Sequence, residues 1–185
     1  DVGGGLGIRY KDEVTIDPKD YAAAILESVG DLGCKIILEP GRFLVGNSGA
    51  FVTEVLYTKK NSYEKHFTIV DGAFNDFLRP VLYQAYHEVL PVKKSNDEEI
   101  LTDIVGPICE TTDTFAKSMS LQPFSPGDLL IMMSAGAYGA SMASSYNSRP
   151  RPKEVLVKDD KFFLIRREEM VEEISKQEVI PEFLM

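Results

Sequence analysis

Cys109 and Glu110 place a thiol directly beside a carboxylate, in a segment that Gly106 and Pro107 mark as a loop. A thiol and an acid can transfer protons and recognise charged ligands, and packing requires neither of them. An isolated cysteine is, however, more often a small buried apolar residue than a reactive thiol. Neighbouring side chains on an extended segment point to opposite sides, so the pair can serve one site only where the backbone is irregular.

Glu39 and Arg42 form a second candidate pair, because they flank a Pro-Gly step just after the apolar run 35–38. That run predicts a buried strand, and α/β folds bind their ligands at the carboxyl ends of strands. An acid and an arginine there could hold a cationic ring nitrogen and an oxyanion. Proline followed by Gly41 also fits a type II turn, which would need no ligand.

Gly3, Gly4 and Gly5 follow the strand-like Asp1-Val2. Consecutive glycines let backbone amides approach an anion closely, so a phosphate would fit here, although a flexible connector is an equal alternative. Tyr138 lies between small residues, which leave room for a ligand unless the ring is a core aromatic.

Arg79 and Tyr83 are four residues apart in a predicted helix of about 75–87 and would share one face of it. Together they offer a planar donor fork and a phenol to a carboxylate. The alternative is an arginine whose stem covers a tyrosine at the edge of the core.

The bulk composition restricts the class of partner. The chain has 185 residues, 44% of them hydrophobic, with a formal net charge of -9, which disfavours nucleic acid and anionic membranes as partners. No apolar run approaches the length of a bilayer span, so a cytoplasmic location is the default expectation. With two cysteines and two histidines we expect no metal site.

The order of elements predicts an α/β unit followed by a mostly β domain, with a boundary near Gly46. A helix should begin after the capping residue Asp17, with Pro18 in its first turn, and run to about Gly30. The expected strands are 50–57, 64–70, 101–105, 129–134, 154–157 and 161–165, and a charged terminal helix is expected at about 168–176.

The ordered set of motifs resembles the pyridoxal-phosphate decarboxylases of fold type III, and among them the diaminopimelate decarboxylases most closely. The resemblance extends from the start of the chain to about Arg167. The matching segments are Gly3-Gly-Gly-Leu-Gly-Ile8, Glu39-Pro-Gly-Arg42, Asp71 to Asp76 with Arg79 to Tyr83, Gly106-Pro-Ile-Cys-Glu110, Ala135-Gly-Ala-Tyr-Gly139 and Tyr146 to Val155.

The resemblance implies a fold and an assembly. Residues 1–45 would be the carboxyl-terminal end of a (β/α)8 barrel of the alanine-racemase type, which binds pyridoxal 5'-phosphate, and residues 46–185 a β-barrel-like or β-sandwich domain. The enzyme would be a homodimer with shared active sites. We therefore expect the chain to be the carboxyl-terminal part of a longer protein, with residues 1–45 packing on a missing amino-terminal barrel segment, on the β domain or on a second copy.

The resemblance also assigns roles. The glycines at 3, 4 and 5 would cradle the cofactor phosphate, aided by amides of Gly41 and Arg42 and by Tyr138, and Glu39 would pair with the pyridinium nitrogen. Cys109 would donate a proton to the substrate carbanion in the active site of the partner subunit. Glu110 would bind the distal amino group of the substrate in that same site. The residues expected to bind substrate are Arg42, Arg79, Tyr83, Glu110 and Tyr138.

Three points complicate the match. Thr111-Thr112 and Ser134 depart from the residues expected at those positions, and residues 178–185 match no motif. The lysine that this family links to its cofactor, and the histidine that stacks on the ring, precede the glycine motif in relatives, so we expect this chain alone to be inactive.

The expected reaction of the intact enzyme is decarboxylation of meso-2,6-diaminopimelate to L-lysine and CO2, the last step of lysine biosynthesis. The alternatives are a relative acting on arginine, ornithine or carboxynorspermidine, and a non-catalytic binding module.

Overall fold

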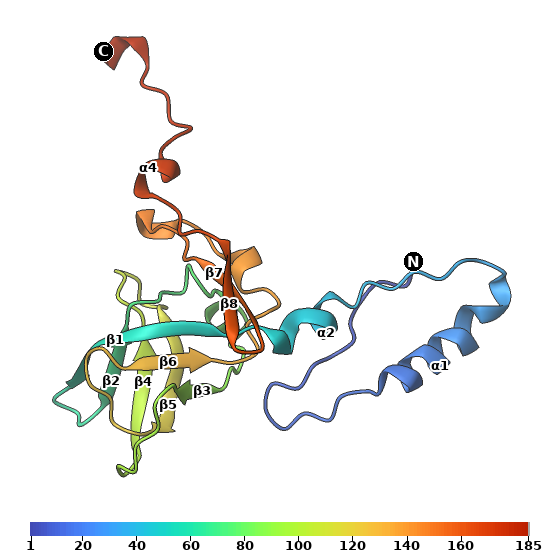
Figure 1. Cartoon of the computed structure of the whole chain (residues 1–185), viewed down its shortest axis with the longest axis horizontal. Coiled ribbons are helices and arrows are strands. Elements are labelled where there is room, and N and C mark those ends of the chain that lie inside the picture. The colour runs from blue at the N-terminus through green and yellow to red at the C-terminus, as the bar shows by residue number, and fades with distance from the viewer. Residues whose placement is uncertain (185) are drawn as a thin grey trace.

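The computed structural model describes residues 1–184. It consists of a curled sheet domain, an amino-terminal arm that leaves the domain on one side, and a carboxyl-terminal extension that leaves it on another (Figure 1). The strands of the main sheet are β1 (Phe51–Lys60), β2 (His66–Val70), β3 (Val89–Pro91), β4 (Ile100–Val105), β5 (Thr114–Leu121) and β6 (Leu129–Met132). The β-barrel-like sheet domain expected from the sequence is therefore present.

The six strands lie in the order β3-β6-β1-β2-β4-β5. The predicted hairpin of β1 and β2 is confirmed as an antiparallel pair, and β2 pairs with β4 in parallel. Apolar side chains from these strands and from the intervening loops fill one core, consistent with a sheet curled around its inner face. The core residues are Val55, Val70, Phe77, Val89, Ile104, Phe115, Leu121, Phe124, Leu130 and Met132.

Two strands, β3 and β5, were not predicted from the sequence. β5 pairs with β4, but its register shifts twice and Ser118 has a positive φ of 50°. The bulge breaks the strict alternation of buried and exposed residues by which a strand is recognised. β3 has only three residues, which is too short for any period to appear.

The amino-terminal arm contains the predicted helix α1 (Pro18–Val29) and the short helix α2 (Gly41–Val45). Asp17 caps α1 as expected, because its side chain accepts a hydrogen bond from the amide of Lys19 at 2.7 Å. No residue of α1 is buried. Residues 1–45 therefore do not form a closed, self-sufficient unit.

The prediction of a buried strand at 35–38 is wrong. These residues form no assigned strand, and Ile37 is 47% exposed. The segment is held beside the first residues by two backbone bonds, from Val2 N to Ile37 O (3.1 Å) and from Glu39 N to Gly3 O (2.8 Å). A single neighbouring segment cannot bury an apolar run on both faces, as a parallel sheet would.

The helix expected at about 75–87 is much shorter, since α3 spans only Arg79–Tyr83. The side chain of Asn75 binds Asp76 Oδ1 and the carbonyl of Ser144, and Asp76 Oδ2 accepts from the amide of Ala73. Two of these bonds are local and the one to Ser144 is tertiary, and together they hold the residues before α3 in a loop. Gln84, with φ of 51°, ends the helix in the left-handed conformation.

The carboxyl-terminal extension begins with the two-stranded sheet of β7 (Glu154–Lys158) and β8 (Lys161–Arg166), a hairpin that the sequence predicts. The terminal helix expected at 168–176 is reduced to α4 (Val171–Ile174), which buries no residue. An isolated helix of this length has too few hydrogen bonds to extend without tertiary packing. Short 3-10 turns occur at Gly30–Leu32, Gly46–Ser48, Ala140–Met142, Tyr146–Ser148 and Glu182–Leu184.

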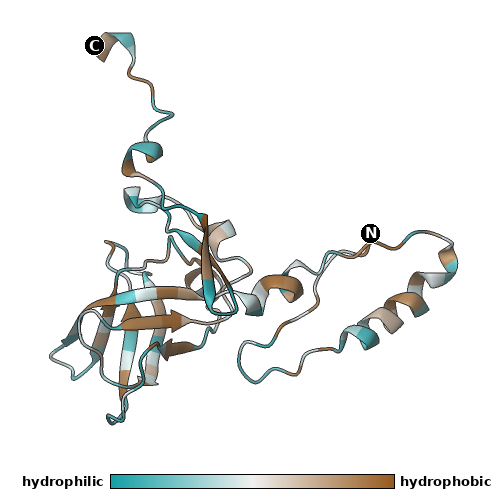
Figure 2. Ribbon diagram, in the orientation of Figure 1, coloured by the Kyte–Doolittle hydropathy of each residue, from teal (hydrophilic) through white to brown (hydrophobic). Residues whose placement is uncertain are grey.

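Apolar residues lie both in the strands of the sheet domain and along the arm (Figure 2). On the arm many remain exposed, among them Leu26 (60%) and Leu44 (68%). No helix among residues 1–184 has the length and apolar character needed to cross a membrane.

Candidate functional site

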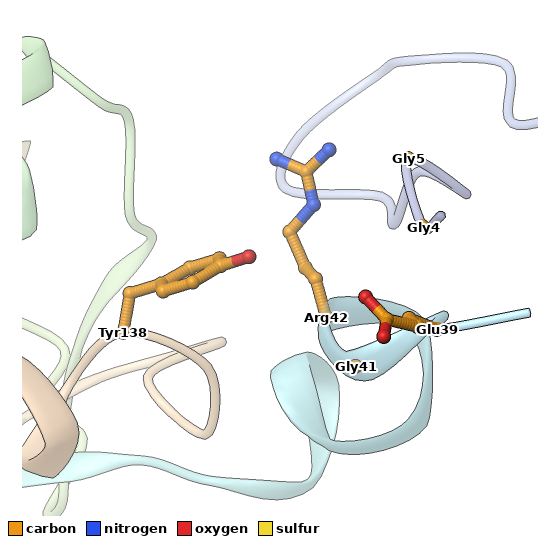
Figure 3. A pocket seen from close by; sticks show the side chains of 6 residues that line it. All are labelled: Gly4, Gly5, Glu39, Gly41, Arg42 and Tyr138. Carbon is orange, nitrogen blue, oxygen red and sulfur yellow. The ribbon is translucent and has the colours of Figure 1, made fainter. Parts of the chain in front are cut away.

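Two neighbouring cavities lie where the arm meets the sheet domain. The first, which we call the glycine cavity, has a volume of about 420 Å³ and is lined by Gly4, Gly5, Glu39, Gly41, Arg42 and Tyr138 (Figure 3). The second, the arginine cavity, has a volume of about 280 Å³ and is lined by Arg42, Arg79, Tyr83 and Tyr138. The structure thus brings together most of the residues that the sequence singles out.

The glycine cavity depends on the absence of side chains. A Cβ on Gly4 would collide with the carbonyl oxygen of Glu39, while Gly5 has φ of 95°, which side-chain-bearing residues rarely adopt. Gly3 also has a positive φ, but its amide donates to Asp1 Oδ1 at 2.7 Å and it does not line the cavity. The glycine cavity therefore needs glycine at positions 4 and 5.

The Pro-Gly step is not the type II turn that the sequence allows. Pro40 has ψ of 47° and Gly41 is the first residue of α2, whose next residue is Arg42. The amide of Gly41 donates to the carbonyl of Glu39 at 2.8 Å, so it is already engaged. In Figure 3 the guanidinium of Arg42 extends into the space between Tyr138 and the glycine loop.

Tyr138 is not a core aromatic, because it is 46% exposed and its hydroxyl points toward Arg42 (Figure 3). Its loop follows β6 and is fixed against the residues after α2. The amide of Ala135 donates to Gly49 O at 2.7 Å, and that of Gly136 to Gly46 O at 3.0 Å. This contact sets the distance between the arm and the sheet domain, and so positions Tyr138 against Arg42.

Arg79 and Tyr83 share a face of α3, as predicted, and both line the arginine cavity. Arg79 is only 9% exposed, whereas Tyr83 is 60% exposed. The guanidinium carbon of Arg79 lies 4.4 Å from the ring centroid of Tyr10. The arginine therefore covers a tyrosine, but that tyrosine belongs to the arm and is not Tyr83.

Cys109 and Glu110 lie apart from both cavities, in the turn between β4 and β5. Cys109 is exposed, so it is not a small buried apolar residue. Glu110 Oε1 accepts from the amide (3.3 Å) and hydroxyl (3.2 Å) of Thr112, and these bonds hold the pKa of Glu110 below its ordinary value. The backbone between β4 and β5 forms bends and a turn here and no strand. Neighbouring side chains such as Cys109 and Glu110 could serve one site only with an irregular backbone of this kind.

Three further residues contact the candidate site residues or the loops that carry them, and the sequence did not predict these contacts. The carboxylate of Asp113 accepts from the amides of Phe74 (2.8 Å) and Ile108 (3.2 Å), and so joins the Cys109 loop to the loop before α3. The hydroxyl of Tyr146 donates to Glu110 Oε2 at 3.3 Å. His87 contacts Arg79, although a continuous helix would have kept the two about two turns apart.

Known proteins resemble this chain over almost its whole length. A model of the C-terminal sheet domain of pyridoxal-dependent decarboxylases matches residues 14–136. The chain is 48% identical to diaminopimelate decarboxylase of Helicobacter pylori over 96% of its own length and 44% of that protein. It is 49% identical to the enzyme of the same name from Neisseria meningitidis serogroup A, with 97% and 44% covered.

A solved structure agrees with these sequence matches. The crystal structure of diaminopimelate decarboxylase from Helicobacter pylori complexed with L-lysine superposes with a TM-score of 0.87 at 46% identity, covering 96% of this chain and 43% of that one. The chain thus spans less than half the length of these relatives. It belongs to the family of pyridoxal-dependent decarboxylases of fold type III, and it contains the C-terminal sheet domain of that family.

Proposed function

We propose that this chain supplies the sheet domain of a diaminopimelate decarboxylase, which releases CO2 from meso-2,6-diaminopimelate and forms L-lysine. The observation that carries the proposal is the shared wall of the two cavities, since Arg42 and Tyr138 line both. A cofactor in the glycine cavity and a substrate in the arginine cavity would be adjacent. The names of the relatives, one of them solved with L-lysine, support this substrate.

The glycine cavity fits pyridoxal 5'-phosphate. The backbone of Gly4 and Gly5 can approach a phosphate closely, and the carboxylate of Glu39 is the partner that a protonated pyridine nitrogen needs. The cofactor, when bound, supplies an electron-withdrawing ring that accepts the electron pair left by CO2. The role of Glu39 in this proposal is to keep the ring nitrogen protonated. The amide of Arg42, in the first turn of α2, has no partner within the helix and can serve the phosphate.

The arginine cavity fits the carboxylates of the substrate. Arg79 and Arg42 offer guanidinium forks that bind a carboxylate through two parallel hydrogen bonds, and Tyr83 adds a phenol. Diaminopimelate carries a second carboxylate that remains after the reaction. Two arginines beside one cavity suit a dicarboxylic amino acid better than ornithine, arginine or carboxynorspermidine, each of which carries a single carboxylate.

Cys109 and Glu110 complete the proposal by acting in the site of a second subunit of a homodimer. Both are accessible, and neither lines the glycine cavity or the arginine cavity of its own chain. In this role Cys109 gives a proton to the carbon from which CO2 departs, and Glu110 binds the distal ammonium group of the substrate. The lowered pKa of Glu110 keeps it anionic for that contact.

The lysine that binds the cofactor covalently would come from outside this sequence. Neither cavity is lined by a lysine of the described chain. The activity proposed therefore belongs to the full-length enzyme, working in the cytoplasm, and not to these 185 residues alone.

The same absence of a lining lysine is what a non-catalytic binding module would show, and this is the second candidate. A module of that kind would bind pyridoxal phosphate or a dicarboxylate without turnover. A relative acting on ornithine, arginine or carboxynorspermidine is the alternative within the enzyme class.

Turnover by the full-length enzyme that carries this sequence decides among these candidates. We expect release of CO2 and formation of L-lysine from meso-diaminopimelate, with kcat/KM far above the values for ornithine, arginine and carboxynorspermidine. Preference for any of those three would contradict the proposed substrate. Absence of turnover on all four, with cofactor bound, would favour the binding module.

A further inference from the structure

The buried side chain of His87 contacts Arg79, one of the two arginines that line the arginine cavity. His87 is 5% exposed, and its Nε2 lies 3.0 Å from an Nη of Arg79. On the other side of the ring, Nδ1 lies 2.9 Å from the carbonyl oxygen of Met133, the residue that follows β6. His87 itself does not line either cavity.

The two partners fix the protonation of the ring. A carbonyl oxygen can only accept a hydrogen bond, so Nδ1 of His87 must carry a proton. A guanidinium can only donate, so Nε2 must be unprotonated and accept from Arg79. Burial, and then the positive charge of Arg79, also lower the pKa of His87, which keeps the ring neutral. One tautomer satisfies both contacts.

Aromatic rings hold the pair from two further directions. Phe77, fully buried in the core, meets the His87 ring nearly edge-on with centroids 4.6 Å apart. Tyr10 of the arm meets the same ring at 5.3 Å and lies 4.4 Å from the guanidinium carbon of Arg79. Tyr10 thus covers the guanidinium of Arg79, and His87 binds one of its Nη atoms. The remaining N–H donors of Arg79 can serve a ligand in the arginine cavity.

We propose that His87 is a positioning residue, which holds the guanidinium of Arg79 in the orientation that binds a substrate carboxylate. The proposal rests on the function proposed above, since it needs a carboxylate in the arginine cavity. A histidine with only a packing role would support the fold equally well without an acceptor directed at Arg79. The acceptor is therefore the feature to test.

Two substitutions separate the acceptor from the rest of the ring. His87→Asn keeps a donor near the position of Nδ1 for Met133 O but loses the acceptor for Arg79. His87→Gln places its amide oxygen near the position of Nε2 and keeps that acceptor. In the full-length enzyme we expect His87→Asn to raise KM for diaminopimelate about tenfold, with a smaller change in kcat, because the charged donor Arg79 loses its acceptor on the histidine ring.

His87→Gln is expected to recover most of this loss. His66→Gln, at the first residue of β2, is the matched control and should leave KM unchanged. Equal KM values for His87→Asn and the wild-type enzyme would overturn the proposal. So would equal losses in the Asn and Gln variants.

A second measurement does not depend on activity or on the folding of a variant. In the wild-type enzyme labelled with 15N at histidine, the His87 ring should show a protonated Nδ1 and an unprotonated Nε2. A proton on Nε2 would overturn the contact on which the proposal rests. If the wild-type enzyme makes no lysine, the proposed function fails, while the tautomer still decides between a directed acceptor and a packing role.

Discussion

Arg42 and Tyr138 face each other between the arm and the sheet domain, with the tyrosine hydroxyl directed toward the arginine side chain (Figure 3). Both residues line both cavities. Neither the arm nor the sheet domain could form these cavities alone, since Arg42 belongs to α2 and Tyr138 to the loop after β6. The proposed site therefore lies at the junction of the arm and the sheet domain and needs residues from both.

Replacing Arg42 should weaken both ligands at once. In the full-length enzyme, Arg42→Ala is expected to lower pyridoxal phosphate affinity and raise KM for diaminopimelate, each by about tenfold to a hundredfold, because hydrogen bonds to a charged group contribute about 1.5–3 kcal/mol. Cofactor titration and steady-state kinetics measure the two effects. Arg9→Ala, which removes an exposed guanidinium that donates to the carbonyl of Lys11, is the control. A change in cofactor affinity alone, or in KM alone, would contradict the proposal that Arg42 serves both cavities.

The glycine cavity can be tested by a pair of matched substitutions. Gly4→Ala adds a methyl group against the carbonyl of Glu39, whereas a methyl group on Gly7 meets nothing within 4 Å. We expect Gly4→Ala to reduce cofactor affinity at least tenfold, since the displaced backbone belongs to the proposed phosphate cradle. Gly7→Ala should bind as the wild type does. Equal affinities in the two variants would place the phosphate elsewhere.

Asp113 should stabilise the loop that carries Cys109. Asp113→Ala leaves the amides of Phe74 and Ile108 without their acceptor, and we expect the free energy of unfolding to fall by about 1–3 kcal/mol. The loop should also become more mobile, so the rate of thiol labelling at Cys109 should rise while that at Cys34 stays constant. Asp97→Ala, an exposed acid, is the control. An unchanged labelling rate at Cys109 would show that Asp113 does not organise this loop.

The pH dependence of stability offers a further test of Asp113. Burial outweighs the two amide bonds and raises the pKa of Asp113 above its ordinary value of 3.8. A raised folded-state pKa means that the folded protein binds the proton more tightly than the unfolded chain does. The contribution of this group is therefore largest below pH 3.8 and declines as the pH rises through the folded-state pKa. The difference in unfolding free energy between wild type and Asp113→Asn, measured by denaturant titration, should decline in that window; a difference that grows with pH would contradict the assignment.

Local sequence chemistry predicted the parts of the fold whose stabilisation is local. Helix α1 follows from the cap at Asp17 and the proline after it, and the hairpins β1-β2 and β7-β8 follow from apolar runs separated by short polar segments. The cavity residues Glu39, Arg42 and Tyr138 were found through their glycine neighbours and their resemblance to a family. In each case the signal lies within a few residues.

Features that depend on distant partners were missed. The helix expected at 75–87 fails because Asn75 binds the carbonyl of Ser144, which no local pattern reveals. His87 gives no signal either, since its role comes from Arg79 and Met133 together. A buried strand at 35–38 needs neighbouring strands, whereas among residues 1–184 the backbone bonds that join this segment and Glu39 to distant parts of the chain reach residues 2–3 alone.

The central claim is that one active site combines the two cavities of one chain with Cys109 and Glu110 of another. Its most direct test is a purified heterodimer of full-length subunits, one carrying Arg42→Ala and the other Cys109→Ala, separated by different affinity tags. If the sites are shared, both defects fall in the same site and the other site is intact, so the heterodimer should recover about half of the wild-type kcat while each homodimer stays impaired. A heterodimer no more active than the mean of the two variant homodimers would contradict the account.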